Sequence, residues 1–218
     1  MMAINSKKNS SRARKTRKVK RGSETKDVAM EWIKSIVIAL ILALITRATV
    51  VQAFRIPTES MKETLLRGDF LLVNKFIYGS QIPFTDIRLP KIRAPKRGDV
   101  IVFKHPTEKK VYIKRCVGLP GDTVELKNDV LYVNDEPVDE PYRFLETSYV
   151  GHRANFGPVR VPEGKLFMLG DNRHNSSDSR VWGMLDMKYL KGKAMVIYFS
   201  WNFDKRFPRF TRFGKLIR

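Results

Sequence analysis

The chain has 218 residues, 43% of them hydrophobic, so it is long enough for one ordinary domain with an appendage and apolar enough to bury a core. That composition excludes wholesale disorder. The formal net charge is +20, and +9 of it falls in the first 26 residues, where ten Lys or Arg face one acidic residue, Glu24. This excess suits a polyanion or an anionic membrane surface as a neighbour. The single cysteine, Cys116, excludes a disulfide framework and a cysteine-based zinc site within one chain.

An uncharged apolar run follows the basic tail, at residues 35–46, between Lys34 and Arg47. Twelve helical residues cover about 18 Å, which is less than the roughly 30 Å hydrocarbon core of a bilayer. Residues 32–54 would cover about 34 Å as a helix and would cross it. We therefore predict an uncleaved transmembrane helix over residues 32–54, from which Lys34 and Arg47 reach toward the interfaces.

Two other interpretations of this segment stay open. A basic region, an apolar region and the small-residue site at 51–53 also resemble a cleavable signal peptide, although Arg47 and the length of the basic region argue against cleavage. A buried helix of a soluble domain is the second alternative. For an uncleaved span, the positive-inside rule places residues 1–31 in the cytoplasm and residues 55–218 outside.

The rest of the chain predicts mostly β-strands. Residues 100–103, 111–117 and 194–201 are rich in β-branched and aromatic side chains. Asn128-Asp129 between two apolar runs is a two-residue hairpin signal, and a second hairpin is predicted over residues 159–169. The chain shows neither a βαβ pattern nor a glycine-rich nucleotide motif, which disfavours a Rossmann or P-loop fold.

Residue types alone identify no active site. His105, His152 and His174 do not have the spacing of a zinc site, and the carboxylates are scattered. A Ser-His-Asp triad stays possible because its members can come from distant positions.

Three stretches carry a more specific signal. They are residues 56–69 (IPTESMKETLLRGD), 112–122 (YIKRCVGLPGD) and 170–183 (GDNRHNSSDSRVWG). In this order after a predicted span, and with residues 97–103 (RGDVIVF) before the second, they resemble bacterial type I signal peptidase (leader peptidase), a serine–lysine dyad family. The resemblance covers nearly everything from residue 32 onward.

The resemblance implies a serine–lysine dyad. Ser60 matches the nucleophile of the family and Lys114 its general base. Thr58 matches a position whose hydroxyl forms the oxyanion hole together with the N–H of Ser60. An extended backbone would place the side chains of Thr58 and Ser60 on one face, so that both could address one carbonyl oxygen.

Further positions match supporting residues. Ser176 matches a hydroxyl that orients the lysine amine, and Asp178 and Arg180 match an ion pair behind the site. Two residues depart from the family pattern. Glu59 stands where glycine is common, so its backbone should not need a positive φ. Glu63 stands where proline is common, which puts the geometry of this loop in question.

A lysine base must be neutral to accept a proton. With an unperturbed pKa of about 10.4 it is neutral in roughly one molecule per thousand at pH 7.4, a deficit of about 4 kcal/mol. Burial disfavours the cation and removes this deficit. Lys114 lies between Ile113 and Val117 in an apolar strand pattern, a neighbourhood suited to such desolvation.

The resemblance also implies the fold and the partners. The fold is mainly β, a coiled antiparallel β-sheet catalytic domain that follows one N-terminal transmembrane helix and docks on the outer face of the bacterial inner membrane. Exported preproteins with small residues at −1 and −3 are the substrates, bound as an extended strand. We expect a monomer that needs neither cofactor nor metal and binds no nucleic acid.

Membrane lipids are a further expected partner. Aromatic side chains alternate with Lys and Arg in residues 201–215, as they do at a membrane interface. A surface tail or a nucleic-acid patch is the alternative for this stretch.

Two other classes of protein compete with the peptidase. One is an anchored or secreted β-domain that binds polyanions, for which Ser60 would have no role. The other is a cytosolic serine–lysine autoprotease related to the repressor family. The predicted span and the absence of a helix-turn-helix pattern argue against the autoprotease.

Overall fold

The computed structural model describes residues 28, 30–40, 51–79, 90–108, 110–146 and 154–218, and it divides the chain into two compact units, 1–47 and 48–218. In the first unit, residues 30–40 are helical and exposed. Within the described residues, no helix combines the length and the apolar character needed to cross a membrane. The predicted basic tail lies almost wholly outside the described residues, as do residues 41–50 of the predicted span.

The end of the predicted span needs a correction. Residues 51–54, which we expected in the helix, belong to strand β1 (Val51–Arg55). All five residues of β1 pair with the antiparallel strand β2 (Asp69–Asn74). The backbone N–H and C=O groups of this segment therefore form the hydrogen bonds of a sheet and not those of a helix.

The second unit is mainly β, which confirms the predicted fold class, and its named strands all pair antiparallel. The larger sheet has the order β1-β2-β11-β3-β4-β9-β10, with β12 and β13 both paired to β11. Beyond β1 and β2 its strands are β3 (Val100–Lys104), β4 (Val111–Gly118), β9 (Lys165–Leu169), β10 (Leu185–Asp186), β11 (Leu190–Asn202), β12 (Phe207–Pro208) and β13 (Lys215–Leu216).

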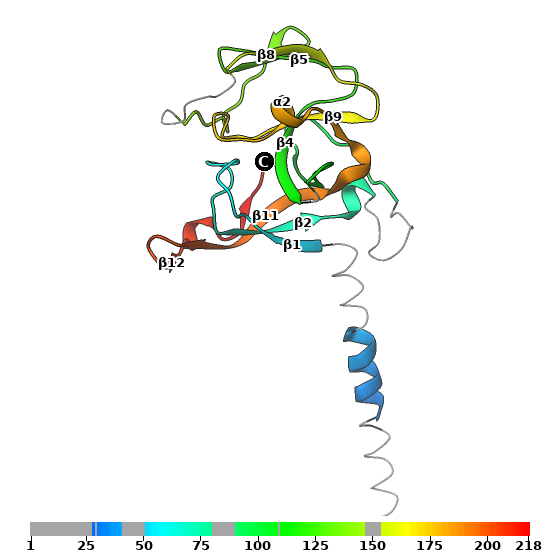
Figure 1. The fold of residues 1–218 in the computed structure, drawn as a ribbon. Coiled ribbons are helices and arrows are strands. Elements are labelled where there is room, and N and C mark those ends of the chain that lie inside the picture. Colours follow the sequence, from blue (N-terminus) through cyan, green and yellow to red (C-terminus); the bar gives the residue numbers. More distant parts are fainter. Residues whose placement is uncertain (1–27, 29, 41–50, 80–89, 109, 147–153) are drawn as a thin grey trace, which may run out of the picture. The chain divides into compact units, whose positions relative to one another are not determined.

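The smaller sheet has the order β7-β6-β5-β8. Its strands are β5 (Thr123–Lys127), β6 (Val130–Val133), β7 (Glu136–Pro137) and β8 (Phe156–Arg160). The helices of this unit are short: η1 (Phe76–Tyr78), α2 (Ser179–Trp182), η2 (Met187–Tyr189) and η3 (Phe210–Arg212). In Figure 1, β5 and β8 lie at one end of the unit and β1, β2 and β11 at the other, with β4 and β9 between them.

One predicted hairpin is confirmed and the other is wrong. Asn128 and Asp129 both have positive φ, 50° and 66°, as a two-residue turn between β5 and β6 requires. The segments on either side of residues 162–164 do not pair with each other, because β8 pairs with β5 and β9 pairs with β4. Each of the two strands therefore completes a different sheet.

Strand β11 gives the larger sheet its curl. It pairs with β3 near its beginning and with β2 along its middle, and its register shifts at three places along these ladders. Such bulges bend a strand and increase its twist. At Gly192 a Cβ would lie 2.3 Å from the backbone oxygen of Asn74, so only glycine allows β2 and β11 to approach this closely.

Candidate active site

Ser60 lies in the loop between β1 and β2, residues 56–68, which we call the serine loop. Its Oγ is 2.5 Å from Nζ of Lys114 on β4, and the two atoms share a hydrogen bond. Both residues are buried, with 8% of Ser60 and 4% of Lys114 exposed. The structure therefore brings together two predicted site residues that are 54 positions apart in the sequence.

The serine loop is held by the core and by the third sequence stretch. Met61 and Leu65 are fully buried and pack in one hydrophobic cluster with Ile56 and with residues of β2, β3 and β11. The N–H of Asn172 donates to the carbonyl oxygen of Ser60 at 3.1 Å. Packing on one side and a backbone hydrogen bond on the other thus fix the position of Ser60.

Burial lowers the pKa of Lys114 to about 8, because the interior disfavours its cation. Asp178 and Asp171 act in the opposite direction, and Arg180 lowers the pKa further. With a pKa of about 8, roughly a fifth of the molecules carry a neutral amine at pH 7.4, against about one in a thousand for a free lysine. Lys114 is buried, as its apolar strand pattern suggested.

Ser176 does not make the contact that the resemblance implied. Among the described residues, its buried Oγ has no hydrogen-bond partner, and the amine of Lys114 is bonded to Ser60 instead. The hydroxyl faces Gly170, where a Cβ would lie 2.1 Å from it. Glycine at position 170 therefore leaves the room that this serine occupies.

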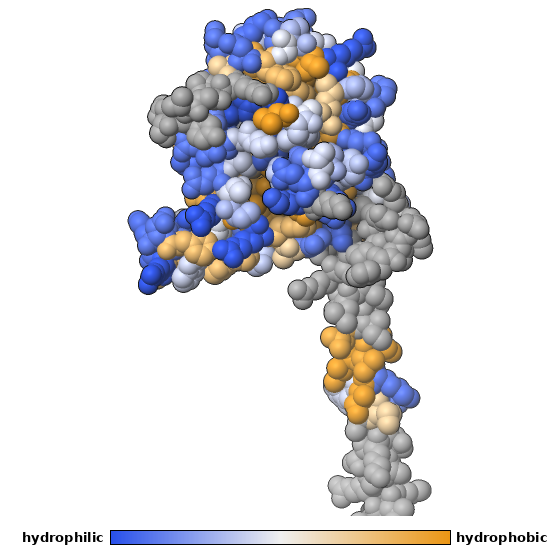
Figure 2. All heavy atoms as spheres, viewed as in Figure 1, coloured by the Kyte–Doolittle hydropathy of each residue, from blue (hydrophilic) through white to orange (hydrophobic). Residues whose placement is uncertain are grey.

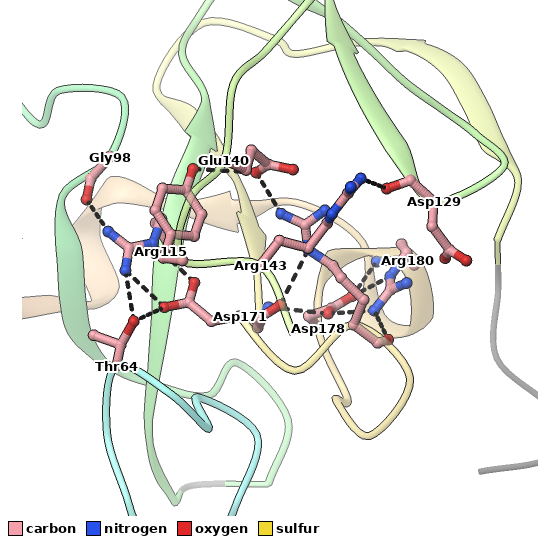
Figure 3. Close-up of polar contacts among 12 residues, drawn as sticks. Thr64, Gly98, Arg115, Asp129, Glu140, Arg143, Asp171, Asp178 and Arg180 are labelled. Atoms are coloured by element: carbon pink, nitrogen blue, oxygen red, sulfur yellow. Dashed lines mark hydrogen bonds and ion pairs between the residues drawn. The ribbon is translucent and has the colours of Figure 1, made fainter. Parts of the chain in front are cut away.

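Asp178 and Arg180 form the expected ion pair. Nε and one terminal nitrogen of Arg180 donate to the two carboxylate oxygens of Asp178 at 2.9 and 2.8 Å (Figure 3). Asp178 also caps α2 and accepts from the N–H of Gly170, while Arg180 donates to the carbonyl of Arg173. The pair therefore holds residues 170–180 together, and both of its charges act on Lys114.

The backbone around the serine differs from our expectation at one position and agrees at another. Residues 58 and 59 form a bend and Ser60 begins a turn, with Thr58 exposed and Ser60 buried, so the expected extended segment is wrong. Glu59 has no positive φ, as predicted. Glu63 has a φ of 74°, which proline cannot adopt, so the loop departs here from the commoner family pattern.

The sequence reasoning missed a buried network formed by one residue from each of the three stretches. Arg115 donates to both oxygens of Asp171, at 2.8 and 2.6 Å. Thr64 donates to the same carboxylate at 2.5 Å and accepts from Arg115 at 3.1 Å (Figure 3). The guanidinium lies 3.6 Å from the ring centroid of Tyr142. The adjacency of Arg115 to Lys114 was the signal that could have revealed this network.

No group of acidic, histidine or cysteine side chains that could hold a metal ion occurs in the described part of the chain. The chemistry available at the site is that of a hydroxyl hydrogen-bonded to a desolvated amine, which is the arrangement of an activated nucleophile.

Comparisons with known proteins show which family the chain resembles over most of its length. Residues 29–201 match the family model described as signal peptidase, peptidase S26. Signal peptidase I of Pseudomonas aeruginosa is 40% identical over 222 residues, which cover 85% of this chain and 78% of the relative. Signal peptidase I of Bacillus licheniformis is 38% identical over 84% of this chain and 95% of the relative. A solved signal peptidase I from Enterococcus faecalis has 34% identity and a TM-score of 0.41, covering 46% of this chain and 97% of that one.

The extent of these matches makes the chain a serine peptidase, a hydrolase. It belongs to the signal peptidase family, peptidase S26.

Proposed function

We propose that this protein is a membrane-bound endopeptidase that removes N-terminal signal peptides from exported preproteins and cuts after small residues at −1 and −3. Ser60 is the nucleophile and Lys114 the general base. The observation that carries this proposal is the 2.5 Å hydrogen bond between Oγ of Ser60 and Nζ of Lys114 in a buried setting.

The reaction uses these two side chains in two stages. The neutral amine of Lys114 takes the proton of Ser60 while the hydroxyl oxygen attacks the scissile carbonyl carbon. The lysine cation then gives its proton to the leaving amine as the peptide bond breaks, which leaves an ester on Ser60. Water, deprotonated by Lys114, hydrolyses this ester and restores the serine. The N–H of Ser60 and the hydroxyl of Thr58 stabilise the oxyanion in both stages.

A direct test is to incubate the detergent-solubilised protein with a preprotein and to identify the cut by mass spectrometry. We expect one cut after the small residue at −1, and loss of cleavage when that residue is changed to a bulky one. Cleavage at unrelated sites, or no cleavage by the folded protein, would contradict the proposal.

The pKa of Lys114 predicts how the activity depends on pH. Since only the neutral amine accepts a proton, kcat/KM should rise with pH through an apparent pKa of about 8 and level off above it. Initial rates on a preprotein, measured from about pH 6 to about pH 10, give this profile. A rate that still rises near pH 10, as an ordinary lysine would require, would show that the base is not desolvated in solution.

An exposed aromatic surface supports contact with membrane lipids. Phe203, Phe207 and Phe210 are 40, 59 and 61% exposed, and Lys205 and Arg206 lie between them in the sequence. In Figure 2 the end of the unit that carries β12 mixes apolar and charged residues. Aromatic rings with cations suit the headgroup region of a bilayer.

The proposed topology has residues 1–31 in the cytoplasm, a single span, and residues 51–218, which we call the β-unit, outside. Because β1 begins at Val51, the span ends by residue 50, and residues 32–50 would cover about 28 Å as a helix. Protease added to spheroplasts should therefore digest the β-unit and spare an N-terminal tag. A soluble mature protein that begins near Phe54 would instead favour a cleaved signal peptide.

A further inference from the structure

We propose that residues 209–218, which we call the strap, position the serine loop against Lys114, and that Arg212 is the positioning residue through which they act. This inference rests on the proposed roles of Ser60 and Lys114. The strap contains η3 and β13, and β13 pairs with the middle of β11.

Arg212 binds the serine loop and the residue that directly follows it. Its Nε and a terminal nitrogen contact both carboxylate oxygens of Asp69, the residue that follows the loop, at distances of 2.6 to 3.2 Å. The same terminal nitrogen donates to the carbonyl of Thr64, in the middle of the loop, at 2.9 Å. Asp69 is fully buried and also accepts from the N–H of Leu66 and the hydroxyl of Ser200. One guanidinium thus joins the end of the loop to its middle.

The strap also packs against the loop. Ile217 is 6% exposed and belongs to the hydrophobic cluster that contains Met61, next to Ser60, and Leu65. This apolar contact and the contacts of Arg212 act on the same short segment.

The strap reaches the lysine side of the pair as well. A main-chain oxygen of Arg218 accepts from Arg115, the neighbour of Lys114, at 2.8 Å. Arg115 in turn donates to the hydroxyl of Thr64, whose carbonyl accepts from Arg212. A closed circuit of hydrogen bonds therefore runs from the strap through the serine loop to β4 and back to the strap.

Two measurable effects follow if Arg212 sets the position of this loop. A small displacement of Ser60 lengthens its hydrogen bond to Lys114, and a misplacement of about 1 Å can cost on the order of a hundredfold in rate. A looser loop also admits water to Lys114, which moves its pKa back toward that of a free lysine. The change should therefore lower kcat and shift the pH profile upward, with little effect on KM.

Arg212→Lys in the full chain tests this. Lysine keeps a positive charge beside Asp69 but has no planar fork with which to contact both carboxylate oxygens and the carbonyl of Thr64. We expect kcat to fall about tenfold or more, the apparent pKa to rise, and hydrogen exchange of residues 60–69 to become faster, as read by mass spectrometry. The matched control is Arg93→Lys, because Arg93 contacts both oxygens of Asp99 and the carbonyl of Ala94 away from the serine loop.

A second pair of variants covers the case in which Arg212→Lys does not fold. Thr64→Val removes the hydroxyl that joins the loop to Arg115 and Asp171, whereas Thr64→Ser keeps it. We expect the valine variant to reproduce the loss of kcat and the pH shift, and the serine variant to stay close to the parent enzyme.

Unchanged kcat, pH profile and loop exchange in folded Arg212→Lys would overturn the inference, as would an equal loss in Arg93→Lys. If Arg212→Lys does not fold, parent-like behaviour of Thr64→Val would overturn it. Hydrogen exchange needs no substrate, so it reports on the strap even if the parent protein cleaves no preprotein. A folded parent protein that cleaves no preprotein would contradict the proposed function and not the role of the strap.

Discussion

Alanine at Ser60 or at Lys114 is expected to reduce preprotein cleavage to near background, a loss on the order of 10⁴-fold or more. Ser60→Ala removes the attacking oxygen. Lys114→Ala removes the amine that would take the proton of that oxygen. Among the described residues, no other side chain is hydrogen-bonded to Oγ of Ser60. Because the two residues act as a unit, the double variant should be scarcely slower than either single variant. Initial rates of cleavage of a purified preprotein give all three values.

Matched controls separate this effect from general damage. Ser177→Ala and Lys104→Ala change exposed residues of the same types and should leave the rate unchanged. Thermal unfolding of each variant checks that it is folded. Substantial cleavage by folded Ser60→Ala or Lys114→Ala would rule out the dyad.

Thr58→Val should lower kcat by about 10²–10³, or roughly 3–4 kcal/mol of transition-state stabilisation. Thr58 is exposed and lies two positions before Ser60, and its hydroxyl is the donor that the proposed mechanism assigns to the oxyanion. Valine is nearly isosteric, so the fold and KM should change little. Thr58→Ser keeps the donor and should retain most of the rate. Kinetics of both variants on one preprotein provide the measurement.

Two outcomes would contradict this role for Thr58. A valine variant as fast as the parent enzyme would show that the hydroxyl is not used. A serine variant as slow as the valine variant would show that the methyl group matters and that the donor does not. The second outcome is informative because the chain bends at residues 58 and 59, so the backbone is not the extended one from which we expected residues 58 and 60 to share a face.

Local sequence signals predicted the fold class and one of its turns well. The β-branched and aromatic runs became β3, β4 and β11, since such side chains fit a half-buried sheet. The turn at Asn128-Asp129 formed because both residues tolerate a positive φ. The hairpin at residues 159–169 failed because the choice of partner strand depends on the whole sheet and not on the connecting turn.

The candidate site was predicted in its parts but not in all of its contacts. The juxtaposition of Ser60 and Lys114 came from motif resemblance, which carries information about tertiary structure that a local pattern lacks. The orientation of Ser176 and the network of Thr64, Arg115 and Asp171 could not be predicted, since hydrogen-bond partners depend on distances between segments more than 50 positions apart. The end of the span was misplaced because Val51–Arg55 is apolar enough for a helix and also suits a strand.

The buried network of Thr64, Arg115 and Asp171 bears on whether the protein can cleave other proteins before it has folded. Its contacts join segments that are 51 to 107 positions apart, so they form only when most of the β-unit has folded. Ser60 is hydrogen-bonded to Lys114, the neighbour of Arg115 in this network, and burial is what lowers the pKa of the lysine. If Ser60 and Lys114 act as proposed, we expect an incompletely folded chain to keep this lysine protonated and to cleave no other protein. Proteolytic activity should then appear and disappear together with the native structure.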